Sequence, residues 1–373
     1  MSHPAPDPGL DERAAALRFE LAQALSDSGD LVTLAWRDAF EHVPRHVFVP
    51  AYYDSSGRRI SGDAPDTREE WLAGVYADRT LITQRTDGAP TSSSTVPSLM
   101  AEMLEALDIT DNDTTVLEIG TGTGYNSALL AHRLGGQHVT TVDLTDELTE
   151  PARERLAKAG YRPRVITGDG AHGHAAAAPY GCVLATCGIE SVPPAWLDQL
   201  ADGGLILAPL GLGLARIRRT GSRTAEGRFI GTAAFMPLRH GEETGPPKGD
   251  LAQLSDAPGR PSTLPTAMLF DNAFRFLVGV VEPGLVWQYD LDDRRAPNGA
   301  RVWSPDGSIA GLDADGTVTE AGPRRLWTHL EETYAVFRGN DEPAPDRYGV
   351  SVSGTAQRVW LDTPDGPSWP LST

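Results

Sequence analysis

The 373-residue chain has few of the residues that would make it a disulfide-stabilised or nucleic-acid-binding protein. It contains only two cysteines, Cys182 and Cys187, too few for a disulfide framework in a chain of this length. Positive charge is also scarce: 32 lysines and arginines face 51 aspartates and glutamates, and the formal net charge is -19. A surface of this sign repels a polyanion, so we predict no nucleic-acid partner.

Long apolar runs are absent as well. No run approaches the roughly 18 residues that a membrane-spanning helix requires. The opening residues, MSHPAPDPGL, have neither the basic region nor the apolar run of a secretory signal. We therefore predict a cytoplasmic protein without a membrane partner. His172 and His174 have no third ligand at a usual spacing, so no metal site is predicted.

The chain does contain apolar side chains at the spacing of a helix, and short apolar runs of the length of a strand. Helices are expected over residues 11–28, 31–42 and 96–107, and the proline-bounded segment 44–50 is predicted to be extended. Between residues 115 and 209 short apolar strands alternate with helices, and 215–238 reads as strands joined by a glycine-rich turn. This order predicts an α/β fold with a doubly wound, Rossmann-like sheet that ends in an antiparallel hairpin.

The composition changes after residue 239. The segment 240–250, HGEETGPPKGD, is a polar linker rich in glycine and proline. Beyond it a helix is expected over 324–338 and strands over 348–353 and 358–362. We therefore predict one domain over residues 1–239, with a helical segment at its N-terminus. A small accessory α+β domain over 240–373 would follow, for which peptide binding is a candidate role.

Residues 116–131, VLEIGTGTGYNSALLA, form a glycine loop after a buried apolar run. Gly120, Gly122 and Gly124 follow Glu118 in the pattern E-x-G-x-G-x-G. A dinucleotide-binding loop would need glycine at position 125 or 127, and a triphosphate-binding loop would need G-K-[ST]. Neither condition is met. S-adenosyl-L-methionine, which has no phosphate, remains as the expected ligand of such a sheet.

Two acidic residues follow the next strands of the expected sheet. Asp143 ends HVTTVD, where a carboxylate can bind both ribose hydroxyls, and Asp169 lies between two glycines after the third strand, near the expected adenine. Cys187 ends a further strand and is expected at the same pocket. The predicted cofactor-binding residues are Glu118, Gly120, Thr121, Gly122, Thr123, Gly124, Tyr125, Asn126, Asp143, Leu144, Gly168, Asp169, Gly170 and Cys187.

Taken together, these segments resemble the protein-L-isoaspartate O-methyltransferase family. VPRHVFVP (43–50), VYADRTLIT (75–83), VLEIGTGTGY (116–125) and FMPLR (235–239) are similar to successive family motifs, and the likeness covers roughly residues 30–239. It implies a carboxyl O-methyltransferase that converts S-adenosyl-L-methionine to S-adenosyl-L-homocysteine.

The family's substrate segment is replaced here by the longer QRTDGAPTSSSTVP (84–97). Alignment on Pro97 places Ser93, Ser94 and Thr95 where the family's hydroxyl residues hold the substrate carboxylate, so the resemblance gives them that catalytic role. The alternative is a flexible loop or a helix N-cap before Pro97. The two interpretations are compatible, because a helix N-terminus also favours a carboxylate.

The layout beyond residue 239 resembles longer family members that accompany the maturation of ribosomally made peptides. The similar segments are W-x-x-L-E-x-x-Y (327–334) and V-W-L-D-x-P (359–364), and graspetide systems are more similar than lanthipeptide systems. This implies a precursor peptide, crosslinked by an ATP-grasp ligase, whose aspartate is methylated and closes to an aspartimide. Isoaspartyl repair and a non-catalytic peptide-binding protein remain as alternatives.

Overall fold

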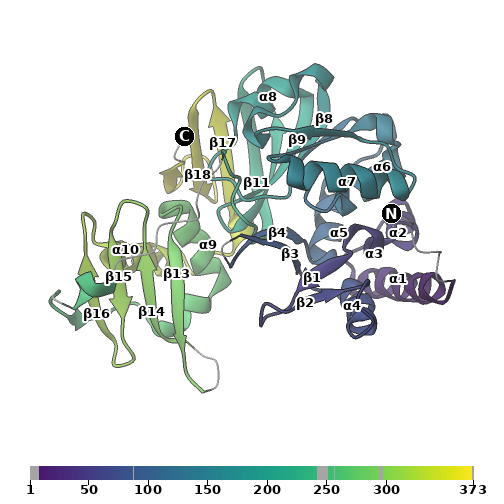
Figure 1. Ribbon diagram of the computed structural model, residues 1–373. Coiled ribbons are helices and arrows are strands. Elements are labelled where there is room, and N and C mark those ends of the chain that lie inside the picture. Colours follow the sequence, from purple (N-terminus) through teal and green to yellow (C-terminus); the bar gives the residue numbers. More distant parts are fainter. Residues whose placement is uncertain (1–7, 87, 242–250, 256, 294–296, 372–373) are drawn as a thin grey trace.

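A large mixed sheet forms the centre of the computed structural model (Figure 1), which describes residues 8–86, 88–241, 251–255, 257–293 and 297–371. Within these residues the sheet has ten strands, in the order β19-β18-β17-β11-β10-β9-β8-β5-β6-β7. In chain order they are β5 (Val116–Ile119), β6 (Val139–Asp143), β7 (Arg164–Thr167), β8 (Tyr180–Ala185), β9 (Leu200–Leu210), β10 (Gly213–Arg219), β11 (Thr224–Thr232), β17 (Tyr348–Ser353), β18 (Ala356–Leu361) and β19 (Ser368–Pro370).

The five strands β7-β6-β5-β8-β9 are parallel, as the alternation of strands and helices predicts. All four residues of β5 are buried, and three of them are apolar, as is typical of a central strand covered on both faces; the fourth is Glu118. The connecting helices are α6 (Tyr125–Leu134), α7 (Asp146–Lys158) and α8 (Pro194–Gln199). From β9 onward each strand is antiparallel to its neighbour, so the expected antiparallel hairpin, β10–β11, is confirmed. The sheet does not end there as expected, because three further strands continue it beyond β11.

The N-terminal region adds helices that share an apolar core with the parallel sheet, and a small sheet whose last hairpin lies at the carboxyl ends of the parallel strands. Its elements are α1 (Pro8–Ser28), α2 (Leu34–His42), α3 (Arg45–Phe48), β1 (Ala51–Tyr53), β2 (Arg59–Ser61), α4 (Arg68–Val75), β3 (Leu81–Thr86), β4 (Ala89–Ser94) and α5 (Pro97–Ala106). The four strands form an antiparallel sheet in the order β2-β1-β3-β4.

Two predictions for this region are wrong. Segment 44–50 contains the short helix α3 instead of an extended strand, because burying Arg45 and Phe48 on one side requires a helical turn. The serine-rich segment is neither a flexible loop nor a helix cap. It forms strand β4, paired with β3, and α5 begins after Val96 without a side-chain cap. Hydroxyl and β-branched side chains are compatible with this strand.

The region beyond residue 239 divides differently from the expected single accessory domain. A five-stranded sheet, β12-β16-β15-β14-β13, packs with two helices. The last three strands instead extend the large sheet, where β17 pairs with β11 over five residues. The elements are β12 (Arg260–Pro261), α9 (Asn272–Val281), β13 (Val286–Leu291), β14 (Pro297–Trp303), β15 (Ile309–Leu312), β16 (Thr317–Ala321) and α10 (Leu326–Gly339).

Helix α9 connects the two sheets (Figure 1). Its Phe276 packs against Phe229 of β11 and Tyr348 of β17, with ring centroids 4.7 and 5.0 Å apart. One apolar core therefore spans both sheets. Most of the expected linker, residues 242–250, lies outside the described residues. Among the described helices, none combines the length and the apolar character needed to cross a bilayer.

Candidate active site

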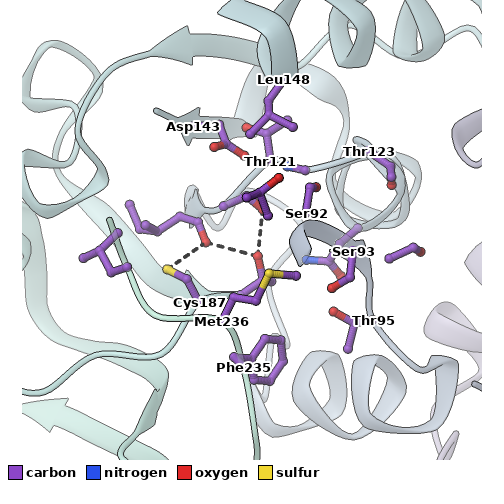
Figure 2. Close-up of a pocket in the computed structure, with 18 of the residues that line it drawn as sticks. Ser92, Ser93, Thr95, Thr121, Thr123, Asp143, Leu148, Cys187, Phe235 and Met236 are labelled. Carbon is purple, nitrogen blue, oxygen red and sulfur yellow. Dashed lines mark hydrogen bonds between the residues drawn. The ribbon is translucent and has the colours of Figure 1, made fainter. Parts of the chain in front are cut away.

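A cavity of about 580 Å³ lies where the parallel strands end, between them and the β3–β4 hairpin. Its walls come from the glycine loop after β5, the end of β6, the hairpin and the segment 234–239. Figure 2 shows Asp143 and Thr121 on one side, Ser92, Ser93 and Thr95 on another, and Cys187, Met236 and Phe235 beside them. The crevice at the carboxyl ends of such strands is the usual ligand site of a doubly wound sheet.

The glycine loop needs glycine at two positions that line the cavity. Gly120 and Gly122 have φ angles of +97° and +50°, which other residues rarely adopt. A side chain at Gly120 would also place its Cβ 2.6 Å from Thr186 Oγ1. The loop can therefore approach a ligand with its backbone.

Asp143 is fixed at the end of β6 by two backbone donors. The Gly122 N–H donates to Oδ2 at 2.7 Å, and the Leu144 N–H donates to Oδ1 at 2.8 Å. Burial raises the pKa of Asp143, and the two N–H donors oppose this shift. Each carboxylate oxygen keeps a free lone pair beside the cavity, as binding of two ribose hydroxyls requires. These residues fit S-adenosyl-L-methionine.

Most of the predicted site residues line this one cavity. They are Ser93, Ser94, Thr95, Gly120, Thr121, Gly122, Thr123, Tyr125, Asn126, Asp143, Leu144, Gly170 and Cys187. Four predicted cofactor-binding residues do not line it: Glu118, Gly124, Gly168 and Asp169. The structure gives three of these four a supporting position.

Glu118 is fully buried behind the glycine loop. It accepts hydrogen bonds from the Ser127 hydroxyl and from Asn126 Nδ2, the latter at 2.7 Å, and so fastens the start of α6 to β5. Burial raises the pKa of Glu118 to about 7. Gly124, with φ +87°, packs against α7, where a Cβ would come 3.4 Å from Ala152 Cβ.

Asp169 stabilises the turn after β7. Its Oδ1 accepts the Ala171 N–H at 2.8 Å, and its Oδ2 lies 3.0 Å from His240 Nδ1. Only the adjacent Gly170 reaches the cavity. Contact of Asp169 with adenine therefore stays a prediction.

The hydroxyl groups of the β4 segment lie beside the cofactor loop. A Cβ on Gly122 would lie 3.6 Å from the Ser93 carbonyl oxygen and 3.8 Å from Ser92 Oγ. Ser92 Oγ accepts from Thr83 Oγ1 at 3.3 Å, and Ser94 Oγ accepts from Arg45 Nη2 at 3.1 Å. A hydroxyl that accepts from the protein keeps its own proton to donate. The hydroxyls of Ser93 and Thr95 have no partner among the described residues.

Arg45 lies directly behind these hydroxyls and is fully buried. Its guanidinium donates to Ser94 Oγ and to the carbonyl oxygens of Val75 and Thr95, both at 2.9 Å. It also lies over the Tyr125 ring, 5.7 Å from the centroid. Burial lowers the pKa of Arg45 to about 10, so the side chain is a cation at neutral pH.

This buried cation has no carboxylate within ion-pair distance in the part of the chain that the structure describes, and its Nε has no hydrogen-bond partner. Asp78 raises the pKa of Arg45 electrostatically without forming an ion pair, so the buried charge is compensated only in part, which is unfavourable. The wall that carries Ser93, Ser94 and Thr95 is thus electrostatically suited to an anion.

The sequence analysis did not identify several residues of the cavity. The missed lining residues include Ser92, Leu148, Thr186, Phe235, Met236 and Arg239. The motif FMPLR did indicate the end of the methyltransferase domain, but its residues form an irregular segment with a single bridge, Gly188 to Pro237, and no closing strand. Arg239 lowers the pKa of Asp143 electrostatically, against the larger effect of burial.

A histidine cluster lies away from this cavity. Side-chain atoms of Asp38, His42 and His132 lie within 4.8 Å of one another. His132 bonds Asp38 Oδ2 through Nε2 at 2.7 Å and Tyr161 through Nδ1 at 2.9 Å. These hydrogen bonds account for the cluster. His172 and His174 lie outside the cavity as well.

A doubly wound sheet with a glycine loop, a carboxylate at the end of the second strand and a crevice free of phosphate-binding motifs defines a class I methyltransferase. The family model of protein-L-isoaspartate(D-aspartate) O-methyltransferase matches residues 18–243. The chain belongs to this family, and it is a carboxyl methyltransferase that depends on S-adenosyl-L-methionine.

Individual relatives agree with this assignment. The protein-L-isoaspartate O-methyltransferase of Methanothermobacter thermautotrophicus is 34% identical over 233 residues, which are 60% of this chain and 96% of the relative. That of Methylorubrum populi is 35% identical over 208 residues, 55% of this chain and 86% of the relative.

One solved structure, of a protein-L-isoaspartate O-methyltransferase, is similar beyond the matched region. It is 22% identical with a TM-score of 0.54, and the likeness covers 93% of this chain and 100% of that one. At this identity the likeness concerns the fold alone.

Proposed function

We propose that this enzyme methylates an aspartate side chain in a ribosomally made precursor peptide that has already been crosslinked. The proposed class of peptide is the graspetides. The ester would then close to an aspartimide. The observation that supports a carboxylate substrate is the buried, unpaired cation of Arg45 behind the hydroxyls of Ser93, Ser94 and Thr95. The altered length and serine content of this segment favour a substrate other than the family's usual one.

The site needs no general base for the transfer. An aspartate with an ordinary pKa near ~3.9 is already ionised at neutral pH. When bound, the cofactor supplies an electrophilic methyl group on a sulfonium. The chain's own residues then have to align the carboxylate and exclude water. Phe235, Met236 and Leu148 provide the apolar part of the wall that keeps water away.

Hydrogen bonds to the carboxylate have opposing effects in this reaction. They bind and orient the substrate, but they also stabilise the charge of the nucleophile, which decreases as the methyl group is transferred. Neutral hydroxyls in contact with the substrate and a cation one layer further away, as Ser94 and Arg45 are arranged, give orientation with a smaller loss of reactivity.

Closure to the aspartimide needs little from the protein. The backbone nitrogen of the following residue attacks the ester carbonyl, the bond to the methoxy oxygen breaks, and methanol leaves with the amide proton. The product is one water lighter than the original aspartyl peptide. An ATP-grasp ligase is the proposed supplier of the crosslinked substrate, and a cytoplasmic location stays a prediction from the sequence.

Repair of isoaspartyl residues is the second candidate. It is favoured by the names of the relatives and by the fold of the solved structure that also covers the extension. A mass-spectrometric assay separates the two functions. Purified enzyme and S-adenosyl-L-methionine are incubated with a generic isoaspartyl peptide, and separately with an aspartyl peptide whose loop is closed by a side-chain amide.

The proposal expects a methyl gain or a water loss on the looped aspartyl peptide alone. Rapid methylation of the isoaspartyl peptide alone would establish repair and overturn the proposed substrate. A linear copy of the aspartyl peptide serves as the control for the crosslink. Methylation of neither peptide by enzyme that binds the cofactor would contradict both candidates.

A further inference from the structure

A second cavity, of about 210 Å³, lies between the methyltransferase sheet and α9. One wall comes from residues 188–190 and 210–212, and the other from α9, the loop after it and Trp287 of β13. The family model ends at residue 243, so the second wall lies outside the part of the chain that the model matches.

This cavity adjoins the active site across one shared segment of chain. Phe235 and Pro237 line both cavities, from two sides of one segment. Their Cα atoms are separated by two peptide units, at most about 7.6 Å. An extended peptide that runs along this segment, with its aspartate in the active site, would need about two or three residues to reach the second cavity.

The segment between the two cavities has free backbone groups. The N–H groups of Ala234, Phe235 and Met236 make no hydrogen bond within the described residues. By contrast, the Gly188 N–H donates to the Met236 carbonyl oxygen, and the Leu238 N–H donates to the Gly188 carbonyl oxygen. Ala234 is exposed and the next two residues are half-buried. An extended peptide could pair with such a segment.

The lining of the second cavity is mainly apolar, with Glu190, Arg275 and Glu282 as its charged residues, and close packing fixes its shape. A Cβ on Gly211 would lie 3.2 Å from the Gly279 carbonyl oxygen, so α9 approaches the β9–β10 turn closely. Val278, Leu285 and Trp287 supply apolar surface. The buried acid of this wall, Glu282, is neutralised by Arg324 and lies 2.9 Å from His329 Nδ1.

We infer that this cavity binds an apolar side chain of the substrate peptide, two or three residues from the methylated aspartate. The α9 wall would thus select the peptide, while the first cavity carries out the transfer. This inference rests on the proposed function, because it takes a peptide as the substrate. It gives a role to α9, which lies outside the methyltransferase sheet and lines the second cavity.

The test uses synthetic loop peptides, closed by a side-chain amide, that carry one aspartate. In one series a single leucine is moved through the three positions on either side, and in the reference peptide these positions are glycine. The methylation KM and kcat are measured for each peptide. Binding to the enzyme with S-adenosyl-L-homocysteine is measured in parallel by calorimetry.

We expect leucine at one of these positions to lower KM and Kd by about tenfold relative to glycine, with little change in kcat. The variant L285E places a charge in the cavity, so the ratio of KM for the glycine peptide to KM for the leucine peptide should fall to about one. The variant L291E is the matched control, because Leu291 is an exposed leucine of β13 outside the cavity, and it should keep the ratio.

A leucine preference that persists in L285E, or peptides that bind with no preference at any position, would overturn the inference. Binding with the expected preference but without methylation would contradict only the proposed function. Absence of binding by every loop peptide would contradict the inferred peptide site, while isoaspartyl peptide methylation in the same preparation would show the enzyme to be active.

Discussion

At the scale of single residues, two of the three serines that line the cavity, Ser93 and Ser94, differ in their hydrogen-bond partners. Ser93 has no hydroxyl partner among the described residues, whereas Ser94 accepts from the buried Arg45. We expect S93A to lower kcat/KM about tenfold with an unchanged melting temperature, because only substrate loses a hydrogen bond. S94A should lower both kcat/KM and the melting temperature, since a buried N–H loses its acceptor. Equal melting temperatures for the two variants would contradict this distinction.

Arg45 does not line the cavity and is expected to act through Ser94 and Thr95. R45M removes the cation and the donors to four acceptors, so we expect kcat/KM to fall at least tenfold and stability to fall by roughly 1–3 kcal/mol. R45K keeps the charge without the planar fork and should be intermediate in KM. Steady-state kinetics together with thermal unfolding separates the two effects. Unchanged kcat/KM in a folded R45M would show that the cation has no positioning role.

Asp143 should determine cofactor affinity and not peptide affinity. Its carboxylate is fixed by Gly122 and Leu144, with lone pairs left beside the cavity. D143A should raise the Kd for S-adenosyl-L-homocysteine about 10- to 100-fold, since hydrogen bonds to a charged group are lost. Calorimetric titration measures this, with S93A as the control that keeps cofactor affinity. A similar Kd for D143A and the parent enzyme would place the ribose elsewhere.

At the scale of elements, the contact of Glu118 in β5 with the start of α6 should make the free energy of unfolding depend on pH. Glu118 has an ordinary pKa of 4.5 when unfolded, and burial raises its pKa to about 7 in the folded chain. Between these values the folded state binds the additional proton. The contribution of Glu118 to the free energy of unfolding is therefore fully present below about pH 4.5 and is lost as pH rises through about 7.

The variant E118Q tests this dependence. Glutamine cannot ionise, and the Ser127 hydroxyl can rotate to accept from its amide. We expect denaturant unfolding to show that E118Q is more stable relative to the parent at pH 8 than at pH 5, by roughly 2–3 kcal/mol. An identical difference at both pH values would show that Glu118 is ionised throughout.

For the β3–β4 hairpin, the sequence contains a signal for the turn but none for the pairing of the two strands. The dipeptide Asp87-Gly88 is a turn signal, and Gly88 has φ +81°. The serines after it are weak strand formers by composition, so the pairing with β3 could not be read from them. Their position beside the glycine loop depends on this pairing.

At the scale of the whole molecule, the C-terminal strands are part of the methyltransferase sheet. Strand β17 covers the edge of β11, and Tyr348, Val350 and Val352 are buried in the shared core. We expect a chain truncated after residue 239 to lose cooperative unfolding or to aggregate, because an apolar sheet edge is exposed. Calorimetry of the full chain should show one main transition. A stable, active fragment 1–239 would contradict this.

The sequence by itself determined the methyltransferase core and most of the predicted residues that line its cavity. The order of strands and helices between residues 115 and 209, the glycines at 120 and 122, and Asp143 are local features, because they follow from periodicity, backbone freedom and strand ends. Because parallel strands must be buried on both faces, few strand orders are possible. In each of these orders the two glycines and Asp143 meet at the carboxyl edge of the sheet.

The tertiary structure alone decided the rest, since it depends on contacts between distant segments. Three contacts join residues that are dozens of positions apart in the sequence. They are the pairing of β17 with β11, the hydrogen bond from Arg45 to Ser94, and the cavity that Phe235 and Pro237 line together with α9. The same holds for Glu118, which the motif places at the cofactor but the packing of α6 places behind it. Long-range burial of apolar and charged groups, which no local pattern records, fixed these positions.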